Sequence, residues 1–127
     1  MDHLHLEATA KTPLIDLDPV NGRLEIRGCS IHENAEAFFD RIYSSVEDYA
    51  ASPAPLTEVV ISLEYFNSSS AKYLLDILQR LDDLHAGGGS KVSVAWNYAE
   101  GDLDMLEAGN DYKAMLGMPV KLQAHKS

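Results

Sequence analysis

The chain has 127 residues, the length of one compact domain, so we expect residues 1–127 to fold as a single unit. Apolar residues make up 46% and charged residues 24%, which is ordinary globular usage and argues against disorder. Twenty acidic residues against ten basic ones give a formal net charge of −10. Because binding to nucleic acid or to an anionic membrane requires a cationic surface, neither is expected as a partner.

Cys29 is the only cysteine, which excludes an internal disulfide and a thiolate metal cluster. His3 and His5 share one side of an extended segment and are possible metal ligands, but a loosely ordered terminus is the favoured interpretation. We therefore expect no metal and no cofactor. The first residues lack a basic region followed by an apolar stretch, and no run approaches the about 20 apolar residues of a membrane span. A cytoplasmic protein is expected.

The first predicted elements are strands. Residues 23–27 alternate between charged and apolar side chains, which is the period of a half-buried strand. Asn21-Gly22 suits the positive φ angles of a tight turn, so residues 11–27 are predicted to form a β-hairpin. A shorter strand is expected upstream, around residues 4–6.

The rest of the chain alternates helices and strands. Apolar side chains recur every three or four positions over residues 33–51, 68–86 and 102–116, which predicts three helices. Strands are predicted over residues 57–66, 91–98 and 120–124. The first of these is almost continuously apolar, which indicates a strand covered on both faces. Short strand–helix–strand connections imply parallel pairing and right-handed crossovers, hence an α/β fold with a mixed sheet.

Two of the helices carry clear local signals. The helix over residues 33–51 is expected to be capped by Ser30 with Glu33, or by Asn34 alone. The helix over residues 68–86 is expected to end at a run of three glycines. Its predicted core face consists of Ala71, Leu74, Leu75, Leu78, Leu81 and Leu84.

A run of hydroxyl groups lies where a predicted buried strand ends and this helix begins. Asn67 is followed by Ser68, Ser69 and Ser70, and Lys72 lies one helical turn beyond Ser68. The start of a helix presents unpaired N–H groups that favour an anion, and functional sites collect at the carboxyl ends of parallel strands. One serine would suffice as a helix cap. Two interpretations follow: a cap alone, or a regulatory or binding site.

Aromatic residues lie near the same predicted sheet edge. Tyr65, Trp96 and Tyr98 are candidate interface residues, because aromatic side chains are good anchors for a partner. A place in the core or at its rim is the commoner role for such residues. A small enzyme with its active site at this edge is a further alternative, although no G-x-S-x-G nucleophile motif is present.

The stretch YFNSSSAKYLLDIL, followed by a glycine cluster and the strand VSVAWNY, resembles the SiaC family of bacterial regulatory phosphoproteins. The resemblance extends over most of the chain, from the early hairpin to the final strand. Members of that family are single-domain proteins with a fold similar to the STAS domain. The resemblance therefore implies a STAS-like two-layer domain with an N-terminal hairpin and three helices.

The resemblance also implies site residues. The phosphorylated hydroxyl of the family follows an asparagine and precedes two serines, which maps onto Ser68, with Ser69 as the alternative. Asn67, Ser69 and Ser70 are then expected to shape the loop and to take part in partner binding. Lys72 is expected to steady the phosphate, since it lies four residues along the helix.

The function that the resemblance implies is that of a non-enzymatic switch. Family members are acted on by a serine/threonine kinase of the GHKL type and by a PP2C-like phosphatase. Their unmodified form binds and activates a diguanylate cyclase, which raises cyclic di-GMP and promotes biofilm growth. Phosphorylation is expected to turn binding off, because a partner would have to desolvate the added charge, unless that partner offers arginine residues to pair with it. An anti-sigma-factor antagonist is the alternative within the same binding class.

Overall fold

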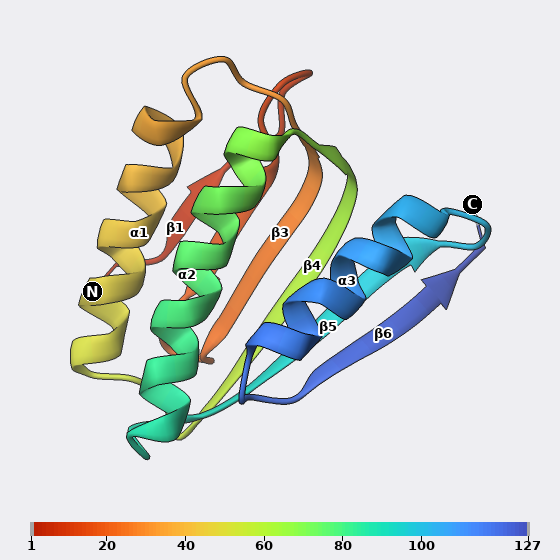
Figure 1. Cartoon of the computed structure of the whole chain (residues 1–127). Helices are drawn as coiled ribbons and strands as arrows, with labels where there is room; N and C mark the ends of the chain where they lie inside the picture. The colour runs from red at the N-terminus through yellow and green to blue at the C-terminus, as the bar shows by residue number, and fades with distance from the viewer. Residues whose placement is uncertain (1, 127) are drawn as a thin grey trace.

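The computed structural model describes residues 2–126, which form one six-stranded sheet and three helices (Figure 1). The predicted order of a hairpin followed by alternating helices and strands is confirmed. In chain order the elements are β1 (Leu4–Leu6), β2 (Leu14–Asp18), β3 (Arg23–Ser30), α1 (Ala35–Ala51), β4 (Leu56–Phe66), α2 (Ser68–Ala86), β5 (Lys91–Ala99), α3 (Leu103–Met115) and β6 (Val120–His125).

The order of the strands in the sheet is the same as their order in the chain. β2 pairs antiparallel with both β1 and β3, whereas β3, β4, β5 and β6 pair in parallel along the rest of the sheet. The predicted hairpin turns at Gly22, whose φ of 66° lies in the left-handed region that favours glycine. Asp18 closes the turn by accepting hydrogen bonds from the backbone N–H groups of Val20 and Asn21.

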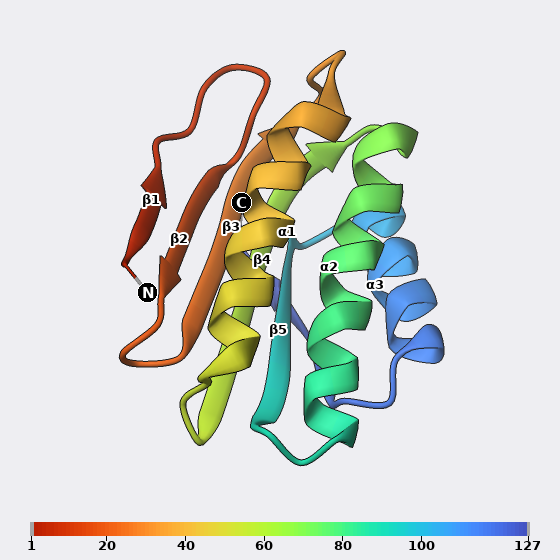
Figure 2. The same cartoon turned by 90° about the vertical axis from the view of Figure 1, so that its left-hand side faces the viewer.

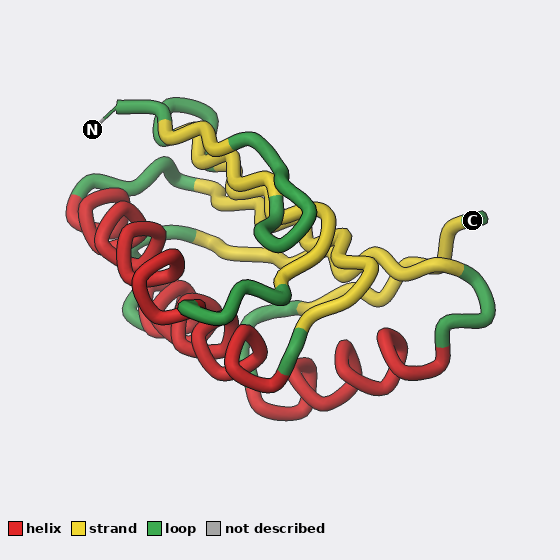
Figure 3. The backbone as a smooth tube through the Cα atoms, turned by 90° about the horizontal axis from the view of Figure 1, so that it is seen from above, coloured by secondary structure: helices red, strands yellow, loops and turns green. Residues whose placement is uncertain are grey.

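α1, α2 and α3 lie on the same face of the sheet, as Figure 3 shows from above. Successive parallel strands are added in one direction only, and right-handed crossovers between them then carry each helix to the same side. The two-layer arrangement expected from the resemblance follows. Because the strand order never reverses, the sheet has no topological switch point, the place where open α/β sheets usually form their ligand crevice.

The single helical layer corrects the expectation that β4 is covered on both faces. Thr57, Val59, Ile61 and Leu63 point toward the helices and are buried, whereas the residues between them are exposed or only half-buried. Val60 made the strand look continuously apolar, but it lies half-buried on the open face. β4 is therefore an alternating strand with one covered face.

The core lies between the sheet and the helices. In α2 the predicted face is largely confirmed, although Ile77 is buried and was not predicted, while Ala71 and Leu75 are only half-buried. The difference has a geometric cause, because the latter two lie on the flank of α2 that faces α3. The buried apolar residues of α2 are Leu74, Ile77, Leu78, Leu81 and Leu84.

Asn34 alone caps α1, since its side-chain oxygen accepts a hydrogen bond from the N–H of Ala37 at 3.3 Å. The other predicted cap, Ser30 with Glu33, is not used. Ser30 is buried at the end of β3, and α1 begins only at Ala35. No helix within residues 2–126 is long and apolar enough to cross a membrane.

Candidate functional site

Asn67 is the one residue between the end of β4 and the start of α2. Its side-chain oxygen accepts a hydrogen bond from the N–H of Ser70 at 2.9 Å, and its carbonyl oxygen accepts one from the N–H of Ala71 at 2.9 Å. Asn67 is therefore the N-cap of α2. The cap therefore needs none of the three serine hydroxyls, and capping does not explain why serines occupy these positions.

Ser70, the third serine of the run, is buried with 1% of its surface exposed. Its hydroxyl donates to the carbonyl oxygen of Ser30 at 3.0 Å and accepts from the Ser30 hydroxyl at 2.7 Å. The same carbonyl accepts from the N–H of Asn67 at 3.0 Å. These bonds fix the first turn of α2 to the end of β3. Burial removes Ser70 from any partner-facing surface and corrects that part of its predicted role.

Ser68 and Ser69 are exposed and occupy the first two positions of α2. In Figure 1 this start of α2 lies beside the ends of β3 and β4. Backbone N–H groups at the first positions of a helix have no carbonyl partner one turn earlier, and the helix dipole places partial positive charge there. A phosphoryl group on Ser68 would thus lie at an electropositive helix end and in contact with water.

Lys72 is exposed, and its ammonium group lies 5.7 Å from the centre of the Tyr73 ring. This cation–π contact holds the side chain beside the first turns of α2. The spacing of four residues from Ser68 suits an interaction along the helix surface. A contact between Lys72 and a phosphate on Ser68 remains a prediction.

The three candidate interface aromatics fall into different environments. Tyr65 is 58% exposed at the end of β4, and Tyr98 is half-buried. Trp96 is 1% exposed, and its indole N–H donates to the carbonyl oxygen of Met105 at 3.0 Å. The proposed interface role of Trp96 is therefore wrong. Alternation along β5 turns this side chain toward the helices, where α3 covers it.

Tyr112 of α3 contributes to the site and was missed by the sequence analysis. Its hydroxyl donates to the carbonyl oxygen of Ala71 at 2.8 Å, directly linking α3 to the first turns of α2. Its ring packs against Phe66 and Trp96. Burial and the neighbouring Asp111 raise the pKa of this phenol, so it stays a donor. No motif marks Tyr112, because the link depends on residues 41 positions apart.

Glu64 lies four residues before Ser68 in the sequence, and its negative charge would repel a phosphate if both faced the same side. In the structure its carboxylate accepts a hydrogen bond from the thiol of Cys29 at 3.6 Å. The pleat of β4 turns Glu64 to the face of the sheet that has no helices, away from α2. Burial and the charge of Glu64 raise the pKa of the Cys29 thiol.

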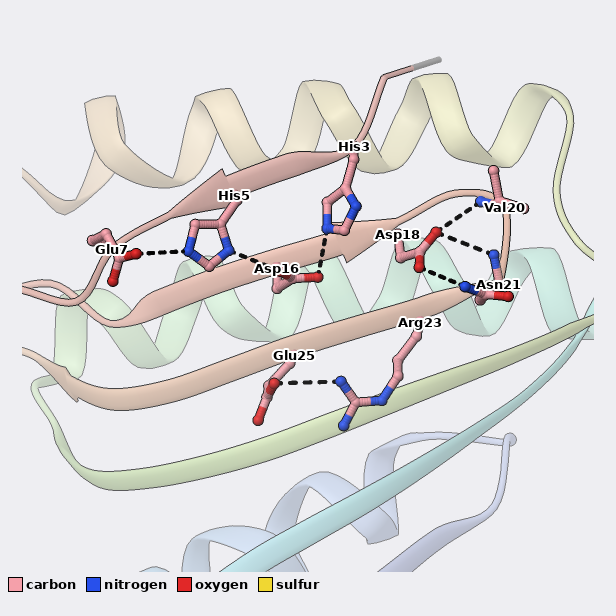
Figure 4. Close-up of polar contacts among 9 residues, drawn as sticks. All are labelled: His3, His5, Glu7, Asp16, Asp18, Val20, Asn21, Arg23 and Glu25. Carbon is pink, nitrogen blue, oxygen red and sulfur yellow. Dashed lines mark hydrogen bonds and ion pairs between the residues drawn. The ribbon is translucent and has the colours of Figure 1, made fainter.

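The amino-terminal histidines are ordered, which corrects the interpretation of a loose terminus. Nitrogen atoms of His3 and His5 each lie 2.8 Å from an oxygen of Asp16, and a second nitrogen of His5 lies 3.0 Å from Glu7 (Figure 4). Hydrogen bonds to Asp16 and Glu7 raise the pKa of His5. Within residues 2–126, no group of three or more His, Cys, Asp or Glu side chains is arranged to hold a metal ion.

Comparisons with known proteins agree on one family. The family described as "SiaC family regulatory phosphoprotein" matches residues 6–125. An uncharacterised protein of Pseudomonas aeruginosa strain UCBPP-PA14 is 34% identical over 125 residues, which are 98% of each chain.

Solved structures give the same answer. The structure of SiaC of Pseudomonas aeruginosa superposes with a TM-score of 0.90 at 34% identity and covers 98% of this chain and 100% of that one. A second structure is that of the diguanylate cyclase SiaD in complex with its activator SiaC from the same organism. It matches with a TM-score of 0.90 at 34% identity and covers 96% of this chain and 99% of that one. The chain belongs to the SiaC family of regulatory phosphoproteins.

Proposed function

We propose that the unmodified protein binds and activates a diguanylate cyclase, and that phosphorylation of Ser68 releases this partner. One observation carries the proposal: Ser68 is exposed at the start of α2, while Asn67 supplies the cap and Ser70 is buried. Support for the partner comes from the similar protein SiaC, which is the activator of SiaD in their complex. The protein itself has a binding role and not a catalytic one.

The charge of a phosphate explains why modification acts as an off switch. A phosphoserine carries about −1.5 to −2 charges at neutral pH. A partner that covers Ser68 would have to take this dianion out of water. The free protein keeps the phosphate solvated at the positive end of α2, so modification favours the unbound state. A difference of about 2.8 kcal/mol corresponds to a hundredfold loss of affinity.

The switch requires two further proteins. We propose a serine/threonine kinase of the GHKL type and a PP2C-like phosphatase, acting on Ser68 in the cytoplasm. Of the three serines, only Ser68 and Ser69 present their side chains to a kinase, because Ser70 is enclosed between α2 and β3. We assign the modification to Ser68, the residue that follows the capping asparagine.

The assignment of the modified residue is tested by intact-protein mass spectrometry. The wild-type protein is incubated with ATP and the GHKL-type kinase of its own organism, and one phosphate should be added. Ser68→Ala should abolish the addition, whereas the matched variant Ser69→Ala should leave it intact. Equal labelling of Ser68→Ala and wild type would overturn the assignment.

The switch itself is tested with the Pseudomonas aeruginosa cyclase SiaD as the probe. The wild-type protein should bind SiaD and raise its rate of cyclic di-GMP synthesis. Ser68→Glu should weaken binding at least tenfold, and unchanged affinity would overturn the switch. Selective capture of an ATP-binding anti-sigma factor in place of a cyclase would favour the antagonist alternative. Turnover of a substrate by the isolated protein would favour the alternative that the protein is a small enzyme.

A further inference from the structure

We propose that the carboxyl ends of β4 and β5 enclose a binding site for a small zwitterion of the amino-acid class. The cavity at this place has a volume of about 290 Å³. Arg27, Ser62 and Glu64 line it and point to the face of the sheet that has no helices. The site is therefore separate from the surface of α2 that presents Ser68, and the inference does not depend on the proposed function.

The cavity exists because the sheet splits between β4 and β5. The parallel ladder between these strands ends at the pair Ile61–Trp96, whereas β4 stays paired with β3 to Phe66 and β5 with β6 to Ala99. The ends of β4 and β5 lie apart in both Figure 1 and Figure 2, where the chain leaves one end for α2 and the other for α3. Backbone groups that face the split have no ladder partner across it and can bond to a polar ligand. The split thus supplies, at the carboxyl ends of parallel strands, the crevice that the strand order does not provide.

The hydrogen-bond donors of the cavity come from β3 and β4. Arg27 and Ser62 occupy paired positions on these neighbouring strands. The Arg27 side chain is 58% exposed and lies 3.5 Å from Glu25, so most of its N–H groups are open to a ligand. The Ser62 hydroxyl accepts a bond across the split from the side chain of Asn97 at 3.1 Å, which leaves its own hydrogen to donate. Together these two donors suit a carboxylate.

The acceptors of the cavity lie nearer the strand ends. Glu64 follows Ser62 by two residues along β4, and Asp102 is the N-cap of α3. One oxygen of each carboxylate is already bonded, to the Cys29 thiol in the case of Glu64 and to the N–H of Met105 at 3.1 Å in the case of Asp102. Among the contacts within residues 2–126, the second oxygen of each is left for a ligand. Carboxylate oxygens of this kind accept the N–H groups of an ammonium ion.

Opposite charges within one cavity identify the ligand as a zwitterion. A simple anion would meet two carboxylates, and a simple cation would meet Arg27, whereas a molecule with both charges pairs with both groups. Two residues along a strand span about 6.5 Å, so the donors and the acceptors are separated by the length of a small molecule. The volume lies at the lower end of the range of about 300–1,000 Å³ for ligand pockets, which favours a ligand of amino-acid size over a nucleotide. Ala99 and His125 complete the lining.

A metal ion does not fit this cavity. Glu64, Asp102 and His125 all line it, but no group of three or more His, Cys, Asp or Glu side chains in the described part of the chain is arranged to hold a metal. The guanidinium group of Arg27 would also repel a cation. The same guanidinium attracts the carboxylate of a zwitterion, so an organic ligand suits the lining better.

The test titrates the full chain, isotope-labelled for nuclear magnetic resonance, with each standard amino acid in turn. At least one amino acid should shift the backbone amide signals of Ser62 and Ala99 saturably, with a dissociation constant of about 1 mM or lower. Acetate and methylammonium, which carry one charge each, should bind at least tenfold more weakly. The absence of a saturable shift with every amino acid would overturn the proposal, and so would equal binding of either single-charge probe.

Variants of the lining locate the site. Arg27→Gln and Glu64→Gln should each weaken binding of the tightest amino acid at least tenfold. The matched controls are Arg23→Gln and Glu58→Gln, since these residues lie on the same two strands and the same face but outside the cavity, and pair with each other at 3.3 Å. Both controls should bind within twofold of wild type. Asp102→Asn keeps an oxygen that can cap α3, so it should weaken binding without changing the melting temperature.

The variants give outcomes that decide the proposal. Binding of the wild-type kind by Arg27→Gln would overturn it, because the carboxylate of the ligand would then have another partner. Equal weakening by the controls would also overturn it, because the effect would be one of general surface charge. Selective loss in the cavity variants, with melting temperatures close to that of wild type, supports the site. None of these measurements uses SiaD or a kinase, so a negative result leaves the proposed function standing.

Discussion

Gly109→Ala tests the packing of α3 against the sheet. Gly109 is buried in the middle of a helix, where alanine is intrinsically better than glycine by about 0.8–1.0 kcal/mol. Helix propensity alone thus predicts that the substitution stabilises the protein. The structure predicts the opposite, because a Cβ atom at this position would lie 2.6 Å from the Cδ1 atom of Trp96 and 2.6 Å from a methyl carbon of Leu122.

The size of the destabilisation depends on whether the side chains near the new Cβ atom can move away from it. Carbon atoms in contact normally lie about 3.5–4.0 Å apart, so the new atom is about 1 Å too close. Leu122 can turn its methyl group away, but the Trp96 ring is enclosed and held by its bond to Met105. Overpacking of this kind costs about 1–3 kcal/mol, and the rigid ring favours the upper part of that range. After the gain in propensity, the free energy of unfolding should fall by about 1–2 kcal/mol.

Urea unfolding measures this change. The chain has a single tryptophan, so fluorescence reports directly on Trp96, and far-UV circular dichroism checks that the whole domain unfolds together. The matched control is Asn110→Ala, on the exposed side of the same helix, which should gain a few tenths of a kcal/mol. If Gly109→Ala were as stable as wild type or more so, the close packing inferred for α3 would be refuted.

Three further outcomes are expected. Asn67→Ala should lower the free energy of unfolding by about 1 kcal/mol in chemical denaturation, and Asn34→Ala by less, because its capping bond is 3.3 Å long against 2.9 Å. An equal fall in the free energy of unfolding for the two variants would contradict this expectation. The raised pKa of His5 means that its pairing with Asp16 stabilises the fold fully below the ordinary value of 6.5 and is lost as the pH rises through the raised pKa. Amide exchange of β1 should therefore quicken as the pH rises above 6.5, and His5→Gln should reduce that pH dependence beyond the intrinsic exchange rate. The raised pKa of Cys29 predicts slow reaction with a thiol reagent at pH 8, and a rate like that of a free thiol would refute it.

The elements of the fold were predictable because their signals are local. The turn at Asn21-Gly22, the helix that begins after Asn67 and the glycines that end α2 all lie where the sequence places them. Errors occurred where exposure depended on a neighbouring layer. Val60 lengthened an apolar run, but no pattern within β4 shows that one face of the sheet has no helices.

The position of the candidate site could be predicted from the sequence, but the burial or exposure of each of its side chains could not. The serine run at the junction of strand and helix left two interpretations, a helix cap alone or a regulatory or binding site, and the structure places the run at that junction. Ser68 and Ser70 look alike in sequence. Ser68 is exposed, whereas Ser70 is buried because its hydroxyl bonds to Ser30, which ends β3 and lies 40 residues earlier in the chain. Trp96 was misjudged for a related reason, since the helix that covers it follows in the chain.

Local rules of backbone and side chain, read from the sequence alone, determined the elements, their order and the place where β4 passes into α2. These rules act over a few residues: alternation along a strand, periodicity along a helix and the bonding of a cap. Only the tertiary structure decided which serines are exposed, which aromatic residue is buried and how the three helices lie on the sheet. These properties arise from contacts between residues far apart in the chain, and the pattern of any one segment does not contain them.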